Sequence, residues 1–290
     1  MNHLDLVKLP ALMELTRGRP EIVVGLIDGP VAMNHPDLVS ANIREIPGSS
    51  QGTCAQATSF ACTHGTFIAG ILCAKRGSIA PAICPGCTLL VRPIFLAATS
   101  GEEQMPSATP EELTAAIVET IDAGARVINL SAALLQPFAK GDRELQEALD
   151  YAAMRGVILV AAAGNQGIVG STGITRHPWV IPIVACDAQG RPLNYSNLGN
   201  SIGQRGLRAP GDKITSLGAD GKPLTFSGTS VAAPFVTGAI ALLLSEFSKV
   251  SSAEFKLAVT QAAGRRKMIV PPLLDAWAAH QVISANQRRR

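Results

Sequence analysis

The chain has 290 residues, of which 47% are hydrophobic and 16% charged, so it can bury a large core and lacks the composition of a disordered protein. Its net charge is +3, and the three arginines at 288–290 account for all of it, so no basic face for nucleic acid is expected. The most apolar run, 231–244, contains Pro234 and is shorter than the ~20 residues that span a bilayer, so no membrane partner is expected.

Five short apolar runs are typical of strands that are buried on both faces. In chain order they are IVVGLID (22–28), LLVRPIF (89–95), RVINLS (126–131), VILVAAAG (157–164) and WVIPIVAC (179–186). Helical patterns cover 65–74, 110–123 and 142–155, and a long one begins near Ser230. Because strands alternate with helices, the sequence predicts an α/β fold, a doubly wound and mainly parallel sheet with helices on both faces.

No internal repeat or low-complexity linker divides the chain. We therefore predict a single domain over 1–290, with its core at about 20–250 and a C-terminal helical segment with an arginine-rich tail at 251–290. Sheets of this kind bind ligands at the carboxyl ends of their strands. Polar residues stand at three of those ends, where Asp28 and Ser131 each close a predicted strand and Asn165 follows a third.

Four short segments join a reactive side chain to glycine. They are GLIDGP with Asp28, ACTHGTFIAG with His64, AAAGNQG with Asn165 and FSGTSVAAP with Ser230. Taken alone, each has an ordinary structural explanation: an aspartate at a strand end is usually a turn residue, and a serine before an apolar helix is usually an N-cap.

Taken together and in this order, the segments resemble the subtilisin-like serine proteases (subtilases, peptidase S8), whose triad runs Asp, His, Ser along the chain. Further matching blocks are VGLIDGPVAMNHPDL, HGTFIAGIL, SIAPAICPGCTLLVRPIF and RAPGDKITSLGADGKPLTFSGTSVAAPFVTGAIALLL, so the resemblance covers about 20–245. It implies a subtilisin-like three-layer sandwich and a serine endopeptidase.

By this resemblance, Asp28, His64 and Ser230 form the catalytic triad. Ser230 would attack the scissile carbonyl, His64 would accept its proton, and Asp28 would orient the imidazole. The oxyanion hole would be formed by the side-chain amide of Asn165 and the N–H of Ser230. The residues expected to contact substrate are Ser131, Ala132, Ala133 and Gly164. The methyl groups of the two alanines and the isobutyl group of Leu134 are expected to narrow the S1 and S4 pockets for substrate side chains.

Some segments are more similar to one subgroup, the PatA/PatG-type proteases of cyanobactin maturation. These are the motif DGPV…HP and the cysteine-containing segments ACTHGT and APAICPGC. That similarity implies a ribosomally made precursor peptide as substrate. Macrocyclising relatives carry an added helical element. The block between Asn165 and Pro178 is compact and the sequence has no large insertion near His64, which favours hydrolysis. A transamidating macrocyclase and an inactive peptide-binding subtilase fold are the alternatives.

No cofactor and no metal are expected. Lys75 and Arg76 stand where secreted subtilases place the oxygen ligands of calcium, and Cys84-x-x-Cys87 has no second pair at zinc-finger spacing. A disulfide could join Cys54 with Cys62 or Cys84 with Cys87, while Cys73 and Cys186 fall in predicted core elements and are interpreted as buried thiols.

The expected partner is a peptide or protein substrate. The N-terminus lacks the apolar stretch of a signal peptide, and only 27 residues precede Asp28, which leaves no room for a propeptide. We therefore expect a cytoplasmic protein, or a secreted one if flanking segments have been removed.

Overall fold

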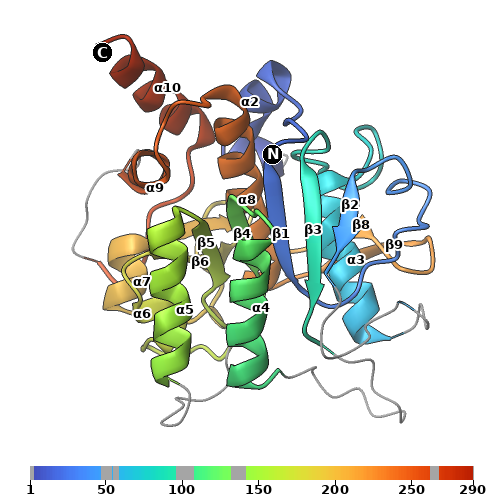
Figure 1. Ribbon diagram of the computed structural model, residues 1–290, viewed down its shortest axis with the longest axis horizontal. Coiled ribbons are helices and arrows are strands. Elements are labelled where there is room, and N and C mark those ends of the chain that lie inside the picture. Colours follow the sequence, from blue (N-terminus) through green and yellow to red (C-terminus); the bar gives the residue numbers. More distant parts are fainter. Residues whose placement is uncertain are drawn as a thin grey trace.

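A seven-stranded, all-parallel sheet forms the centre of the computed structural model, which describes residues 3–46, 54, 59–95, 108–131, 142–261 and 268–289 (Figure 1). The strand order is β2-β3-β1-β4-β5-β6-β7, and a separate antiparallel pair, β8-β9, lies outside it. The strands are β1 (Val23–Asp28), β2 (Ile43–Glu45), β3 (Thr88–Pro93), β4 (Val127–Leu130), β5 (Ile158–Ala162), β6 (Val180–Cys186), β7 (Leu207–Pro210), β8 (Ile214–Leu217) and β9 (Pro223–Phe226).

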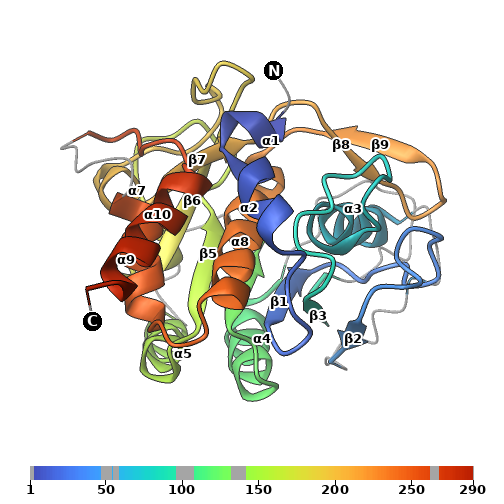
Figure 2. The same cartoon turned by 90° about the horizontal axis from the view of Figure 1, so that it is seen from above.

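Helices cover both faces of this sheet, which gives three layers (Figure 2). On one face lie α3 (Phe60–Cys73) and α8 (Thr229–Glu246), and on the other α4 (Pro110–Asp122) and α5 (Asp142–Arg155). Each face has its own apolar cluster, built from alternate strand residues and the helices above them. The remaining helices are α1 (His3–Leu6), α2 (Leu9–Leu15), α6 (Gly173–Arg176), α7 (Asn200–Arg205), α9 (Ser252–Gln261) and α10 (Ala276–Gln287). The predicted fold class is confirmed.

Within the described ranges, α8 is the one helix with the length and hydropathy of a membrane span, and 89% of that span is buried inside the molecule. The helix lies against strands β4 to β7, and its apolar side chains form much of the larger core cluster. Its composition therefore follows from its place at the centre of the fold.

The five predicted strands correspond to β1, β3, β4, β5 and β6. The sequence patterns missed β2, β7 and the β8-β9 pair, which are only three or four residues long. They also placed the start of α3 wrongly. The hydroxyl of Ser59 accepts a hydrogen bond from the Cys62 N–H and caps the helix, so α3 begins at Phe60 and His64 lies inside it.

Helix α3 sits directly on the segment that follows β1, and two glycines allow the close approach. A Cβ atom on Gly65 would lie closer than 3.0 Å to the carbonyl oxygens of Gly29 and Pro30. A Cβ atom on Gly29 would collide with the carbonyl of Ala61. Because both obstacles are backbone atoms, neither can move aside alone. This contact fixes the distance between the end of β1 and the first turns of α3.

Gly65→Ala should therefore destabilise the protein by about 1–3 kcal/mol, because helix and strand must separate to admit the methyl group. Gly170→Ala is the matched control: its Cβ atom would meet no atom within 4 Å, and its free energy of unfolding should change by less than about 1 kcal/mol. Denaturant unfolding measures both. Equal stability of the two variants would contradict the close packing of α3 on this segment.

Candidate active site

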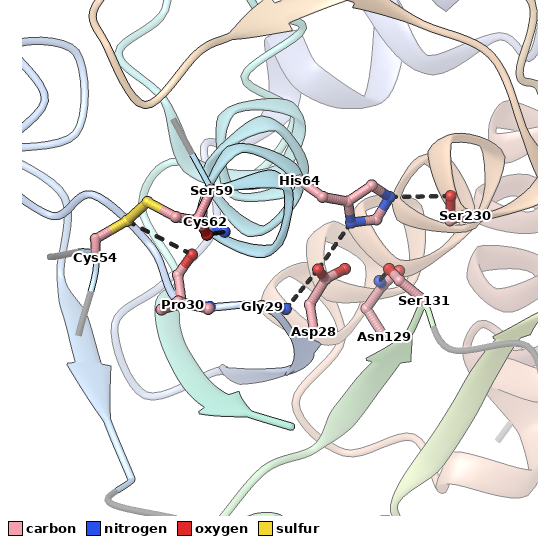
Figure 3. A network of polar contacts seen from close by, with 10 residues as sticks. All are labelled: Asp28, Gly29, Pro30, Cys54, Ser59, Cys62, His64, Asn129, Ser131 and Ser230. Atoms are coloured by element: carbon pink, nitrogen blue, oxygen red, sulfur yellow. Dashed lines mark hydrogen bonds and ion pairs between the residues drawn. A yellow bond between two sulfur atoms is a disulfide. The ribbon is translucent and has the colours of Figure 1, made fainter. Parts of the chain in front are cut away.

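Asp28, His64 and Ser230 come from three elements that are far apart in sequence and form one chain of hydrogen bonds (Figure 3). Asp28 is the last residue of β1, His64 lies in the second turn of α3, and Ser230 is the second residue of α8. Asp28 Oδ1 lies 2.8 Å from His64 Nδ1, and His64 Nε2 lies 3.1 Å from Ser230 Oγ. In this arrangement, the imidazole can take a proton from the hydroxyl while the carboxylate holds its other nitrogen.

The carboxylate of Asp28 is fully buried, and the same oxygen that faces His64 also accepts the Gly29 N–H at 2.6 Å. The His64 side chain is 13% exposed. Burial lowers the pKa of His64, but the charge of Asp28 and the hydrogen bond to it together raise it by more, so the pKa lies above the ordinary 6.5. The carboxylate therefore makes His64 a stronger base than a free imidazole.

Two phenylalanine rings flank the imidazole. The ring of Phe60 lies 5.9 Å from that of His64 and that of Phe226 lies 6.4 Å away, both nearly parallel to it. Phe226, on β9, is held in turn by the buried Phe67 ring at 4.8 Å. The rings add apolar neighbours to an imidazole whose orientation is set by its hydrogen bonds to Asp28 and Ser230. The sequence patterns did not single out either flanking ring, because the hairpin that carries Phe226 was not predicted.

Asn165 lies beside the start of α8, where two donors fix its side chain. The N–H of Thr229 and its hydroxyl donate to Asn165 Oδ1 at 2.9 Å and 3.0 Å. A Cβ atom on Gly228 would lie 3.3 Å from Asn165 Nδ2 and 3.6 Å from Ser230 Oγ, so both groups border the same small space. Ser230 is in the first turn of α8, where backbone N–H groups lack helical partners. Two donors are therefore available next to the Ser230 hydroxyl. Thr229 was not identified from the sequence, although it adjoins Ser230.

The predicted substrate-contacting residues are only partly placed. Ser131 lies beside Asp28 at the end of β4, and its hydroxyl accepts a hydrogen bond from Asn129 Nδ2 at 2.8 Å (Figure 3). Gly164 is buried, and its N–H donates to the Thr229 hydroxyl at 3.1 Å. Ala132 and Ala133 lie outside the described residues. The role of all four in substrate binding stays a prediction.

The cysteines separate into one disulfide and four thiols. Cys54 is bonded to Cys62, one helical turn after the Ser59 cap, so the disulfide ties the chain before α3 to the helix that carries His64 (Figure 3). The thiols of Cys73, Cys84, Cys87 and Cys186 are free and buried. Burial raises the pKa of Cys73 and of Cys186 to about 12, which makes them inert. The sequence left open a Cys54–Cys62 or a Cys84–Cys87 disulfide, and the structure has the Cys54–Cys62 bond.

The location of the protein, cytoplasmic or secreted if flanking segments have been removed, stays a prediction. In the part of the chain that the structure describes, no three His, Cys, Asp or Glu side chains are grouped as a metal site would require.

Reducing the Cys54–Cys62 bond should lower the free energy of unfolding by about 2–3 kcal/mol, as expected for a cross-link that closes a loop of about ten residues. Thermal unfolding with and without a dithiol reductant measures the loss. Cys62→Ser should unfold at the temperature of the reduced protein and should not respond to the reductant. A large response of Cys62→Ser to the reductant would assign the effect to a disulfide between other cysteines.

The comparisons with known proteins identify the family of this chain. The model of the subtilase family, peptidase S8, matches residues 19–281. Subtilisin NAT of Bacillus subtilis subsp. natto is 29% identical over 257 residues, which is 86% of this chain and 62% of that protein, so the chain spans less than two thirds of this relative's length.

Among solved structures, a serine-to-alanine mutant of the PatA protease domain has a TM-score of 0.85 and 30% identity, covering 93% of this chain and 97% of that one. The PatG macrocyclase bound to a peptide has a TM-score of 0.84 at 19% identity, covering 98% of each chain, which shows a shared fold. These findings confirm the predicted resemblance to PatA/PatG-type proteases and the predicted class of subtilisin-like serine endopeptidases. The chain belongs to the subtilase family.

Proposed function

We propose that this chain is a serine endopeptidase that hydrolyses peptide bonds through an acyl-enzyme, with Asp28, His64 and Ser230 as its catalytic triad. The observation that carries the proposal is the unbroken hydrogen-bond chain from Asp28 Oδ1 through both imidazole nitrogens to Ser230 Oγ. A serine hydroxyl becomes nucleophilic only when a base takes its proton, and His64 is within reach.

In the proposed reaction, Ser230 Oγ attacks the scissile carbonyl carbon while its proton passes to His64 Nε2. The negative charge on the carbonyl oxygen is stabilised by Asn165 Nδ2 and the Ser230 N–H, and the imidazolium by Asp28. Collapse of this intermediate breaks the C–N bond, and the leaving amine takes the proton from His64. A water molecule, deprotonated by His64, then hydrolyses the ester and restores Ser230.

For the substrate, we propose a precursor peptide from which a segment is cut. The support comes from the solved relatives: two of them, at 30% identity, are named as patellamide and prenylagaramide maturation proteases. Among the described residues after Asn165, the chain passes through a short turn to the four-residue helix α6, without an added helical element over the site. This favours water over a second peptide amine as the acceptor of the acyl group.

Cleavage of a peptide library in ¹⁸O-water should give linear products whose new carboxyl groups carry the isotope. Ser230→Ala should abolish cleavage, and Ser248→Ala, at an exposed serine on the loop after α8, should leave it unchanged. Product masses from mass spectrometry distinguish linear products that carry the isotope from cyclic products that lack it. Cyclic products without the isotope would identify a macrocyclase, and undiminished cleavage by Ser230→Ala would refute the proposed nucleophile. A folded wild-type chain that cleaves nothing would support the peptide-binding alternative.

The pH dependence should follow His64. Because His64 must be unprotonated to act as the base, kcat/KM should rise with pH through its pKa, which lies above 6.5. In Asp28→Asn the charge is gone and burial remains, so the acid limb should move below pH 6.5, with a rate lower by about 10⁴-fold. NMR titration of the imidazole and kcat/KM against pH measure both. A His64 pKa unchanged in Asp28→Asn would contradict the coupling.

A further inference from the structure

The loop that carries Asn165 needs a support of its own. Residues 165–169 are exposed, whereas an oxyanion donor must be held within a few tenths of an ångström of its place. Thr229 fixes the amide oxygen of Asn165 and its hydroxyl accepts the Gly164 N–H, but among the described contacts it does not hold the backbone that follows Asn165. That backbone is held by a second asparagine, Asn197, which is 4% exposed and lies on the segment after β6.

Every polar atom of the Asn197 side chain is bonded to this loop. Its Oδ1 accepts from the N–H groups of Gln166 and Ile168 at 3.0 Å and 3.2 Å. Its Nδ2 donates to the carbonyl of Ala163 at 3.1 Å and to Gln166 Oε1 at 2.6 Å. The four bonds reach both sides of Asn165, so a shift of Asn197 would displace the loop as a unit.

The backbone of Asn197 and of the next residue also forms hydrogen bonds to the loop that carries Asn165. The N–H of Asn197 donates to the carbonyl of Gly164 at 2.9 Å, and that of Leu198 donates to the carbonyl of Ile168 at 3.0 Å. Gly164 has a φ of +104°, and a Cβ atom there would collide with Asn197 Nδ2. Only glycine therefore allows Asn197 to approach this closely.

We propose that Asn197 is a positioning residue for the reaction, acting through Asn165: it holds residues 163–168 so that Asn165 Nδ2 faces the space beside Ser230. This proposal rests on the proposed function, in which Asn165 is an oxyanion donor. A purely structural Asn197 would contribute to stability without any energetic link to Asn165.

The test is a double-mutant cycle on kcat with a peptide substrate. Asn197→Asp keeps the shape and the acceptor Oδ1, but sets a second oxygen against two acceptors, Ala163 O and Gln166 Oε1. Asn197→Asp should lower kcat at least about tenfold and change KM by less than about threefold. This loss of kcat should be smaller than the loss expected for Asn165→Ala, which is on the order of 10²–10³-fold. In the Asn165→Ala background, Asn197→Asp should lower kcat less than about twofold further.

Gln166→Ala provides a milder variant for the case that Asn197→Asp does not fold. Gln166 is exposed, and its removal takes away one of the four bonds, so kcat should fall by a smaller factor that again vanishes in Asn165→Ala. Gln204→Ala, at an exposed position of α7, is the matched control and should leave kcat unchanged.

Equal losses of kcat in both backgrounds, or a raised KM at unchanged kcat, would overturn the positioning role. The proposed role of Asn165 and the proposed role of Asn197 would be contradicted by different results. If Asn165 is not an oxyanion donor, Asn165→Ala itself will leave kcat unchanged. If only the role of Asn197 is wrong, Asn165→Ala will slow the reaction, while Asn197→Asp and Gln166→Ala will either leave kcat unchanged or lower it equally in both backgrounds.

Discussion

The hydrogen bond between the buried carboxylate of Asp28 and His64 Nδ1 is the interaction on which the rest of the site depends. A carboxylate without solvent exposure is costly unless donors compensate its charge, and here the Gly29 N–H and the imidazole N–H both donate to Oδ1, while the buried Oδ2 accepts no hydrogen bond from the described residues. The same bond leaves His64 Nε2 free to face Ser230 and raises the pKa of the imidazole. One contact therefore orients the base and adjusts its strength.

The fold makes this contact possible by bringing three chain segments to one edge of the sheet. Parallel strands end at a common edge, which places Asp28, Ser131 and the loop after β5 together. The glycine contact seats α3 on the segment after β1, and α8 begins beside the loop of Asn165. Backbone packing and buried side-chain amides thus hold the reactive groups, which is the arrangement that preorganised catalysis requires.

Much of this could be predicted from the sequence, for identifiable reasons. Continuous apolar runs mark strands buried on both faces, and β1 and β6 follow them to within a residue. Asp28, His64 and Ser230 could be grouped because the chain resembles a known family in whole blocks. By contrast, the start of α3 depends on a cap at Ser59, and the choice of Cys62 as the partner of Cys54 depends on tertiary distances. Asn197 gave no signal, because its role arises from hydrogen bonds to a loop about thirty residues away in the chain.

The most direct test of the central claim is labelling with a fluorophosphonate, whose phosphorus is attacked by an activated serine oxygen with loss of fluoride. The account predicts one adduct per wild-type chain, located by peptide mapping at Ser230, and at least a thousandfold slower labelling of His64→Ala, in order of magnitude. A folded wild-type chain that stays unlabelled, or an adduct on a different serine, would contradict it.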